Sequence, residues 1–143
     1  MRKINILVTG AGSGVGQSII KALMLSKFPC EIFPADIDNL NSFMFIFKNS
    51  QLVPKVENKK KALKWYLENL KKLKIDVLLI GSEYDLNFFS RYKTQIKKKT
   101  NCEVCVANLK ILKISNDKYL TQEFLKNNKL PYLKTFVPKN LKE

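Results

Sequence analysis

The chain of 143 residues contains no histidine and three cysteines, and these shortages limit its metal and redox chemistry. Cys102 and Cys105 form a C-x-x-C pair, but they lie in a predicted strand, where side chains three residues apart point to opposite faces. With neither histidine nor a second cysteine pair, the chain lacks the ligands of a tetrahedral zinc site. An odd number of cysteines also argues against a disulfide framework. We therefore predict buried, inert thiols and no metal site.

Long apolar runs are absent as well. No stretch approaches the roughly 18 apolar residues that a membrane-spanning helix needs. The longest runs, near 4–9 and 76–80, have the length of strands. Met1, Arg2 and Lys3 lead directly into the first run without a small-residue cleavage site, so the sequence predicts no signal peptide. We expect no membrane partner and a cytoplasmic location.

Acidic residues are scarce, with 12 against 26 basic ones and a formal net charge of +14. Such an excess suggests a nucleic-acid partner. However, lysine supplies 24 of the 26 positive charges, and many of these lysines fall on the outer faces of predicted helices. Specific nucleic-acid binding usually adds arginine or exposed aromatic residues, and Arg2 and Arg91 are the only arginines. We therefore favour ordinary solvated surfaces and expect no nucleic-acid partner.

Strand-like and helix-like segments alternate along the first 115 residues. The pattern predicts strands at 4–9, 30–35, 51–54, 76–80 and 103–107. It predicts helices at 17–26, 43–47, 59–73, 84–98 and 109–114. The uninterrupted apolar strand at 4–9 is typical of a central parallel strand that is covered on both faces. This order predicts a Rossmann-like α/β fold, a doubly wound parallel sheet of about five strands (order 3-2-1-4-5) in a three-layer αβα arrangement.

The end of the chain departs from this alternation. The sequence predicts one more helix at 116–128, then a loop with one strand that has no sheet partner at 129–138. We therefore predict a Rossmann-like domain at 1–115 and the beginning of a truncated second domain at 116–143. A severed junction exposes apolar surface, so a homodimer is among the expected partners.

Four glycines follow the first strand within a turn of seven residues. Such a turn lets the backbone approach a ligand closely, and the amide groups that begin the next helix then face a negative group. We predict that the turn binds a substrate or another anion through Gly10, Ala11, Gly12, Ser13, Gly14, Val15 and Gly16. The alternative is that these glycines only allow a helix to pack against a strand.

The spacing of the glycines separates two dinucleotide-binding patterns. G-x-G-x-x-G would require glycine at the position of Val15. T-G-x-x-x-G-x-G fits from Thr9 to Gly16 and resembles the pattern of short-chain dehydrogenases, with Asp36 placed to hold a ribose 2′-hydroxyl. That family also needs a tyrosine with a lysine four residues later, and no such pair is formed by Tyr84, Tyr92 or Tyr119. An NAD(P)-binding Rossmann module without a catalytic pair is therefore the alternative hypothesis.

A second resemblance begins after residue 115. N-D-K-Y-x-T-x-E-F-L at 116–125 and L-P-Y-L-K-T at 130–135 resemble the segment that joins the first two domains of ATP-grasp enzymes. Upstream, V-T-G-A-G at 8–12, A-D-I-D at 35–38 and G-S-E at 81–83 resemble the preceding domain of carbamoyl-phosphate-synthase-like members. The chain departs from that pattern at Asn128-Lys129, where N-G is usual, and at Leu133, where a second proline is usual.

This resemblance implies part of an ATP-dependent carboxylate–amine ligase that forms an acyl phosphate from a carboxylate or bicarbonate substrate. It implies that Lys118 contacts the phosphates of ATP, and that Ser82 and Glu83 lie on the substrate side of the cleft. The cofactor of the full-length protein would be Mg-ATP, held by a C-terminal ATP-grasp domain that is missing here. We therefore expect this chain to be inactive alone, with no catalytic residue and no cofactor of its own.

Overall fold

The computed structural model describes residues 3–138, and the chain divides into two compact units, Met1–Val106 and Ala107–Glu143. The first unit contains a parallel sheet of five strands in the order β3-β2-β1-β4-β5. The strands are β1 (Ile4–Thr9), β2 (Cys30–Asp36), β3 (Gln51–Leu52), β4 (Val77–Ile80) and β5 (Glu103–Cys105). The predicted Rossmann-like α/β fold and its strand order are therefore confirmed.

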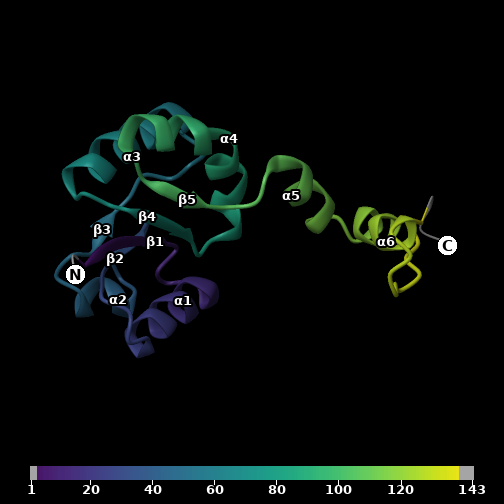
Figure 1. Cartoon of the computed structure of the whole chain (residues 1–143), viewed down its shortest axis with the longest axis horizontal. Coiled ribbons are helices and arrows are strands. Elements are labelled where there is room, and N and C mark those ends of the chain that lie inside the picture. Colours follow the sequence, from purple (N-terminus) through teal and green to yellow (C-terminus); the bar gives the residue numbers. More distant parts are fainter. Residues whose placement is uncertain (1–2, 139–143) are drawn as a thin grey trace. The chain divides into compact units, whose positions relative to one another are not determined.

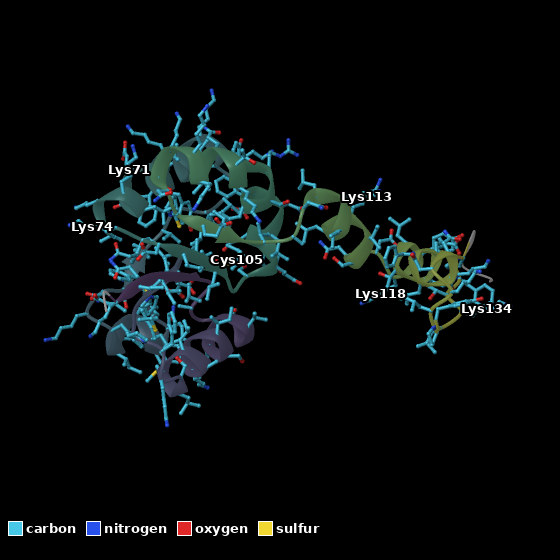
Figure 2. The ribbon with its side chains drawn as sticks, in the orientation of Figure 1. Lys71, Lys74, Cys105, Lys113, Lys118 and Lys134 are labelled. Carbon is cyan, nitrogen blue, oxygen red and sulfur yellow. The ribbon has the colours of Figure 1, made fainter. Side chains whose placement is uncertain are left out.

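Helices cover both faces of this sheet, as Figure 1 shows. One face carries α1 (Gly14–Leu25) and α2 (Ser42–Ile46). The other carries α3 (Lys59–Lys72) and α4 (Glu83–Thr100). Lysines extend from the outer surface, among them Lys71 and Lys74 at the end of α3 (Figure 2).

The central strand β1 is held from both faces by its unbroken apolar run. Leu7 is fully buried on the α3–α4 face, in a cluster that includes Tyr66, Leu70, Leu78 and Phe89. Ile6 and Val8 are buried on the opposite face, in a cluster that includes Ile20, Ile32 and Phe43. Each such side chain contributes about 1.5–3 kcal/mol through burial. The position of the strand's last residue, Thr9, is therefore fixed by the core.

The register of the sheet gathers three chain segments at one edge. Val8 lies opposite Pro34 of β2, and Thr9 lies opposite Ile80 of β4. All these strands are parallel, so their carboxyl ends lie at the same edge of the sheet, where open α/β sheets bind ligands. The glycine-rich turn after β1, the loop after β2 and the turn after β4 therefore lie close together.

The second unit contains two helices, α5 (Leu109–Ser115) and α6 (Lys118–Asn127), which contact each other. The structure thus groups α5 with the second unit, whereas the sequence predicts a boundary after residue 115. The predicted strand within 129–138 is wrong, because the described residues that follow α6 form no strand. A strand needs a neighbouring strand to pair with its backbone groups, and none is available in this segment. No helix in residues 3–138 is long and apolar enough to span a bilayer.

Candidate functional site

A cavity of about 530 Å³ opens at the carboxyl edge of the sheet. The turn after β1, the loops after β2 and β3, and the turn into α4 all contribute to its lining. Its volume lies within the roughly 300–1,000 Å³ that is usual for small-molecule sites. The predicted site residues that line it are Gly10, Gly12, Ser13, Asp36 and Ser82.

The other predicted residues of the first unit do not line the cavity. Ala11 is fully buried, and its N–H donates to the carbonyl of Ala35 at 3.1 Å. Gly14, Val15 and Gly16 form the first turn of α1, beside the lining residue Ser13. Glu83 is exposed at the start of α4. The structure thus brings the glycine-rich turn, Asp36 and Ser82 together and leaves Glu83 outside.

Close packing explains some of the glycines. Gly10 has a φ of +58°, a left-handed conformation that glycine adopts without strain. A Cβ atom on Gly16 would lie 2.0 Å from the carbonyl oxygen of Gly10, and one on Gly81 would lie 2.3 Å from that of Thr9. Gly16 and Gly81 therefore fit the alternative that glycine serves packing, because it lets α1 approach the ends of β1 and β4.

Gly14 is different, because a Cβ atom there would meet nothing within 4 Å. The hydroxyl of Ser13 caps the helix by accepting from the Gly16 N–H at 2.9 Å, and it donates to the Gly81 carbonyl at 2.6 Å. The first N–H with a carbonyl partner four residues back is that of Gln17, which donates to Ser13. The N–H groups of Gly14 and Val15 therefore donate neither to the Ser13 cap nor to a carbonyl group within the helix.

Asp36 connects the end of β2 to the glycine-rich turn. Its Oδ2 accepts from the Gly12 N–H at 2.7 Å, and its Oδ1 accepts from the Asp38 N–H at 3.1 Å. The side chain is largely buried, yet it lines the cavity. A carboxylate offers about four lone-pair sites, so each oxygen of Asp36 can still accept from a ligand hydroxyl.

Asp85, in the first turn of α4, is a lining residue that the sequence analysis missed. Its pKa is raised mainly by burial. The hydrogen bond from Thr9 lowers the pKa, whereas the charges of Asp36 and Glu57 raise it. The signal that could have found Asp85 is its place three residues after Ser82, just beyond the carboxyl end of β4.

Tyr66 carries a buried hydroxyl group near the site, but it lies inside the α3–α4 core and does not line the cavity. It is fully buried, and its hydroxyl has no hydrogen-bond partner among the described residues 3–138. Burial raises its pKa well above the usual value, and the charges of Asp85 and Asp36 raise it further. Tyr66 therefore stays protonated at neutral pH, and its surroundings indicate a core role.

No three metal-ligating side chains gather within residues 3–138. Cys102 is buried, and this burial raises the pKa of its thiol to about 12. The prediction of buried thiols is wrong for Cys105, which is exposed. Cys105 ends the edge strand β5, in which Val104 faces the core and its neighbours face outward.

Lys118 is the first residue of α6, and it lines a separate cavity of about 410 Å³ within the second unit. This cavity lies between α6 and the segment that follows it, and its lining includes Gln122, Leu125 and Tyr132. Gln122 is largely buried, and its Oε1 accepts from the Thr135 N–H. The bond holds the extended segment against the helix, so this cavity has a local structural origin.

Comparison with known proteins gives no family assignment. No family model matches the chain, and no curated protein matches it either. Solved structures do match. A 4-hydroxyisoleucine dehydrogenase complexed with NADH is 23% identical over 53% of this chain and 32% of its own, with a TM-score of 0.41. The ADP-L-glycero-D-manno-heptose-6-epimerase of Helicobacter pylori is 14% identical over 88% of this chain and 51% of its own, with a TM-score of 0.49.

These comparisons contradict the predicted membership of the ATP-grasp enzymes. No family model for such enzymes matches, and the two structures named above are a dehydrogenase and an epimerase. The predictions of a carbamoyl-phosphate-synthase-like ligase and of Mg-ATP as cofactor are therefore wrong. The role of Lys118 loses its support with them. The expected partners, including a carboxylate or bicarbonate substrate and a second copy of the chain, stay predictions.

Helix capping explains why the N-D-K-Y-x-T segment was misleading. Asp117 Oδ1 accepts from the N–H groups of Tyr119 and Leu120 at 2.9 and 3.0 Å, which makes it the N-cap of α6. Thr121 Oγ1 donates to the carbonyl oxygens of Ile114 and Asp117, each at 2.8 Å. Asp, Asn, Ser and Thr are common at helix N-termini for this reason. The motif residues thus have a local role that requires no nucleotide.

Proposed function

We propose that the first unit binds a dinucleotide of the NAD(H) type at the carboxyl edge of its sheet. The observation that carries this proposal is the 2.7 Å hydrogen bond from the Gly12 N–H to Asp36, at the wall of the cavity. It joins the two parts that a dinucleotide site needs, a glycine-rich turn for phosphate and a carboxylate at the end of the second strand for ribose.

The phosphate part is supported by the start of α1. The Gly14 and Val15 N–H groups precede the first intrahelical bond, and the partial positive charge of the helix N-terminus favours an anion there. The open space around the Gly14 Cα leaves room for a phosphate group to approach the backbone. Ser13 is the N-cap of this helix and also lines the cavity, so the proposed phosphate position adjoins the cavity.

The ribose part is supported by Asp36 and Asp38. Asp36 can accept from a ribose hydroxyl while keeping its bonds to the Gly12 and Asp38 N–H groups. A 2′-phosphate would instead bring negative charge toward the two carboxylates that line this part of the cavity. The site is therefore proposed to prefer NADH to NADPH.

The proposed function is binding rather than catalysis by this chain alone. The lining residues include carboxylates and one lysine, Lys55, but no tyrosine–lysine pair spaced for hydride-transfer chemistry. Tyr84 lines the cavity, and the residue four positions later is Phe88, which is buried in the core. We propose a module that presents a dinucleotide.

Titration with NADH and with NADPH tests the proposal, followed by nicotinamide fluorescence and by calorimetry. We expect micromolar affinity for NADH and about tenfold or more weaker affinity for NADPH, since a 2′-phosphate opposed by carboxylates costs on the order of 1.4 kcal/mol or more. ADP-ribose, which lacks the nicotinamide, should compete with NADH. No binding of either dinucleotide at millimolar concentration would refute the function.

A further inference from the structure

Asp85 lines the cavity at the start of α4. Its carboxyl is near enough to Thr9, the fully buried last residue of β1, for the Thr9 hydroxyl to lower its pKa. The Thr9 main chain is fixed in turn, because its carbonyl accepts from the Gly81 N–H at 3.1 Å. Asp85 thus stands on the first turn of a helix, next to a strand end that the core fixes, and rigid elements of this kind suit a ligand-recognising group.

The other carboxylates that line the cavity are placed differently. Asp36 is used by the Gly12 and Asp38 N–H groups, and Asp38 Oδ1 accepts from the Leu40 N–H at 2.9 Å. Glu57 is exposed. Asp85 is half-buried and lines the cavity. Within residues 3–138 no main-chain N–H donates to its carboxylate, so this carboxylate is available to a ligand in the cavity.

Apolar side chains line the same cavity as this carboxylate. Ile37 follows β2, Val53 and Val56 follow β3, and the Tyr84 side chain precedes Asp85 on α4. Such surfaces suit the faces of a planar aromatic base, whose polar edge then needs a partner. Asp36 and Asp85 are close enough for the charge of one to affect the other. A base attached to a ribose at Asp36 would therefore lie within the same cavity as Asp85.

We propose that Asp85 makes this site selective for a purine that carries an amino group at position 6. The proposal rests on the dinucleotide function proposed above. An ionised carboxylate can only accept hydrogen bonds, so it pairs with an amino group. With the ribose held at Asp36, a 6-oxo purine would place an acceptor oxygen at the same ring position. Two facing acceptors leave both unpaired, and such a mismatch in a buried site is costly.

The experiment compares NADH with its hypoxanthine analogue, in which the 6-amino group is replaced by an oxo group. The wild-type protein should bind the analogue about tenfold or more weakly, because a hydrogen bond to a charged group is lost. The Asp85→Asn variant should bind the two dinucleotides within about threefold of each other, because its amide can either accept or donate. This comparison in the wild type needs no variant that might misfold.

Glu83→Gln is the matched control, since Glu83 is an exposed carboxylate in the same helical turn and does not line the cavity. It should keep the wild-type preference for NADH. Equal binding of both dinucleotides by the wild-type protein would overturn the role of Asp85 while leaving the dinucleotide function intact. A preference that survives in Asp85→Asn would also overturn it. Absence of binding by both dinucleotides would overturn the inference together with the function on which it rests.

Discussion

The starts of α1 and α6 were both predicted to contact an anion, and each has a side-chain N-cap, but they differ in the N–H groups that they leave available. At α1 the cap is the neutral hydroxyl of Ser13, which satisfies the Gly16 N–H. At α6 the cap is the carboxylate of Asp117, which satisfies the N–H groups of both Tyr119 and Leu120. The α6 terminus thus already carries its own negative group, whereas α1 keeps two amide groups for another.

This difference explains why one motif is retained as a candidate site and the other is not. A negative group at a helix N-terminus is stabilised by about 0.3–1 kcal/mol, whether it belongs to the chain or to a ligand. Asp117 supplies that group from within the chain, and a phosphate at the same place would be repelled by it. A motif at a helix start therefore indicates a ligand only after the capping bonds have been assigned.

The largest expected effect concerns the packing of α1 against β1. Gly16→Ala would place a methyl group 2.0 Å from the Gly10 carbonyl oxygen, a contact that requires the backbone to move. We expect a loss of about 3 kcal/mol or more in the free energy of unfolding, because neither atom belongs to a flexible side chain. Urea unfolding followed by circular dichroism measures it.

Gly14→Ala is the control, because its methyl group would meet nothing within 4 Å. It should raise stability by about 0.5 kcal/mol, since alanine favours the helix and restricts the unfolded chain. Equal destabilisation by the two substitutions would show that close packing is not what distinguishes these glycines.

A carboxylate placed at the start of α1 should convert this terminus into one like that of α6. Gly14→Glu adds a negative side chain next to the two amide groups, which favours the helix but competes with phosphate. We expect NADH affinity to fall about tenfold or more, on the order of 1.4 kcal/mol, without loss of stability. Gly14→Gln, of nearly the same size but neutral, should bind NADH within about threefold of the wild type. Equal weakening by both would indicate a steric effect.

Removal of either N-cap should lower the free energy of unfolding by a smaller amount than Gly16→Ala does. Ser13→Ala removes both the bond from the Gly16 N–H and the bond to the Gly81 carbonyl, so we expect a loss of about 1–2 kcal/mol. Asp117→Ala should cost about 1 kcal/mol, confined to the second unit. Amide hydrogen exchange resolves the two, because faster exchange should appear in α1 for the first variant and in α6 for the second. Asp117→Asn, which keeps an accepting oxygen, should behave almost as the wild type.

Local patterns sufficed for the sheet, and they failed where a residue's role depends on distant parts of the chain. The apolar run of β1 and the alternation of elements predicted the strand order, because burial on both faces leaves a direct trace in the sequence. The start of α1 was predicted too late, at residue 17 instead of Gly14, because the cap by Ser13 outweighs the poor helix propensity of glycine. Asp85 was missed because its place in the cavity depends on the turn after β1 and the loops after β2 and β3, which lie far away in sequence.

The smallest expected effect concerns stability at Asp85. Burial raises the pKa of its carboxyl, so the folded state binds the proton more tightly than the unfolded state does. Wild-type stability is therefore favoured below the unfolded pKa of about 3.9 and decreases as the pH rises through the raised value. Asp85→Asn lacks this decrease, so its stability relative to the wild type should improve between about pH 3 and pH 7.

Urea unfolding across that pH range measures the difference, with Glu83→Gln as the control for removing a carboxylate from the same helical turn. A relative stability of Asp85→Asn that stays constant or falls with rising pH would contradict the raised pKa. Protonation has a second consequence, because a protonated Asp85 can donate as well as accept. The preference for NADH over its hypoxanthine analogue should therefore narrow as the pH falls, in the wild type and not in Asp85→Asn. The protonation state of the Asp85 carboxyl is therefore expected to set how strongly the cavity distinguishes a 6-amino purine from a 6-oxo purine.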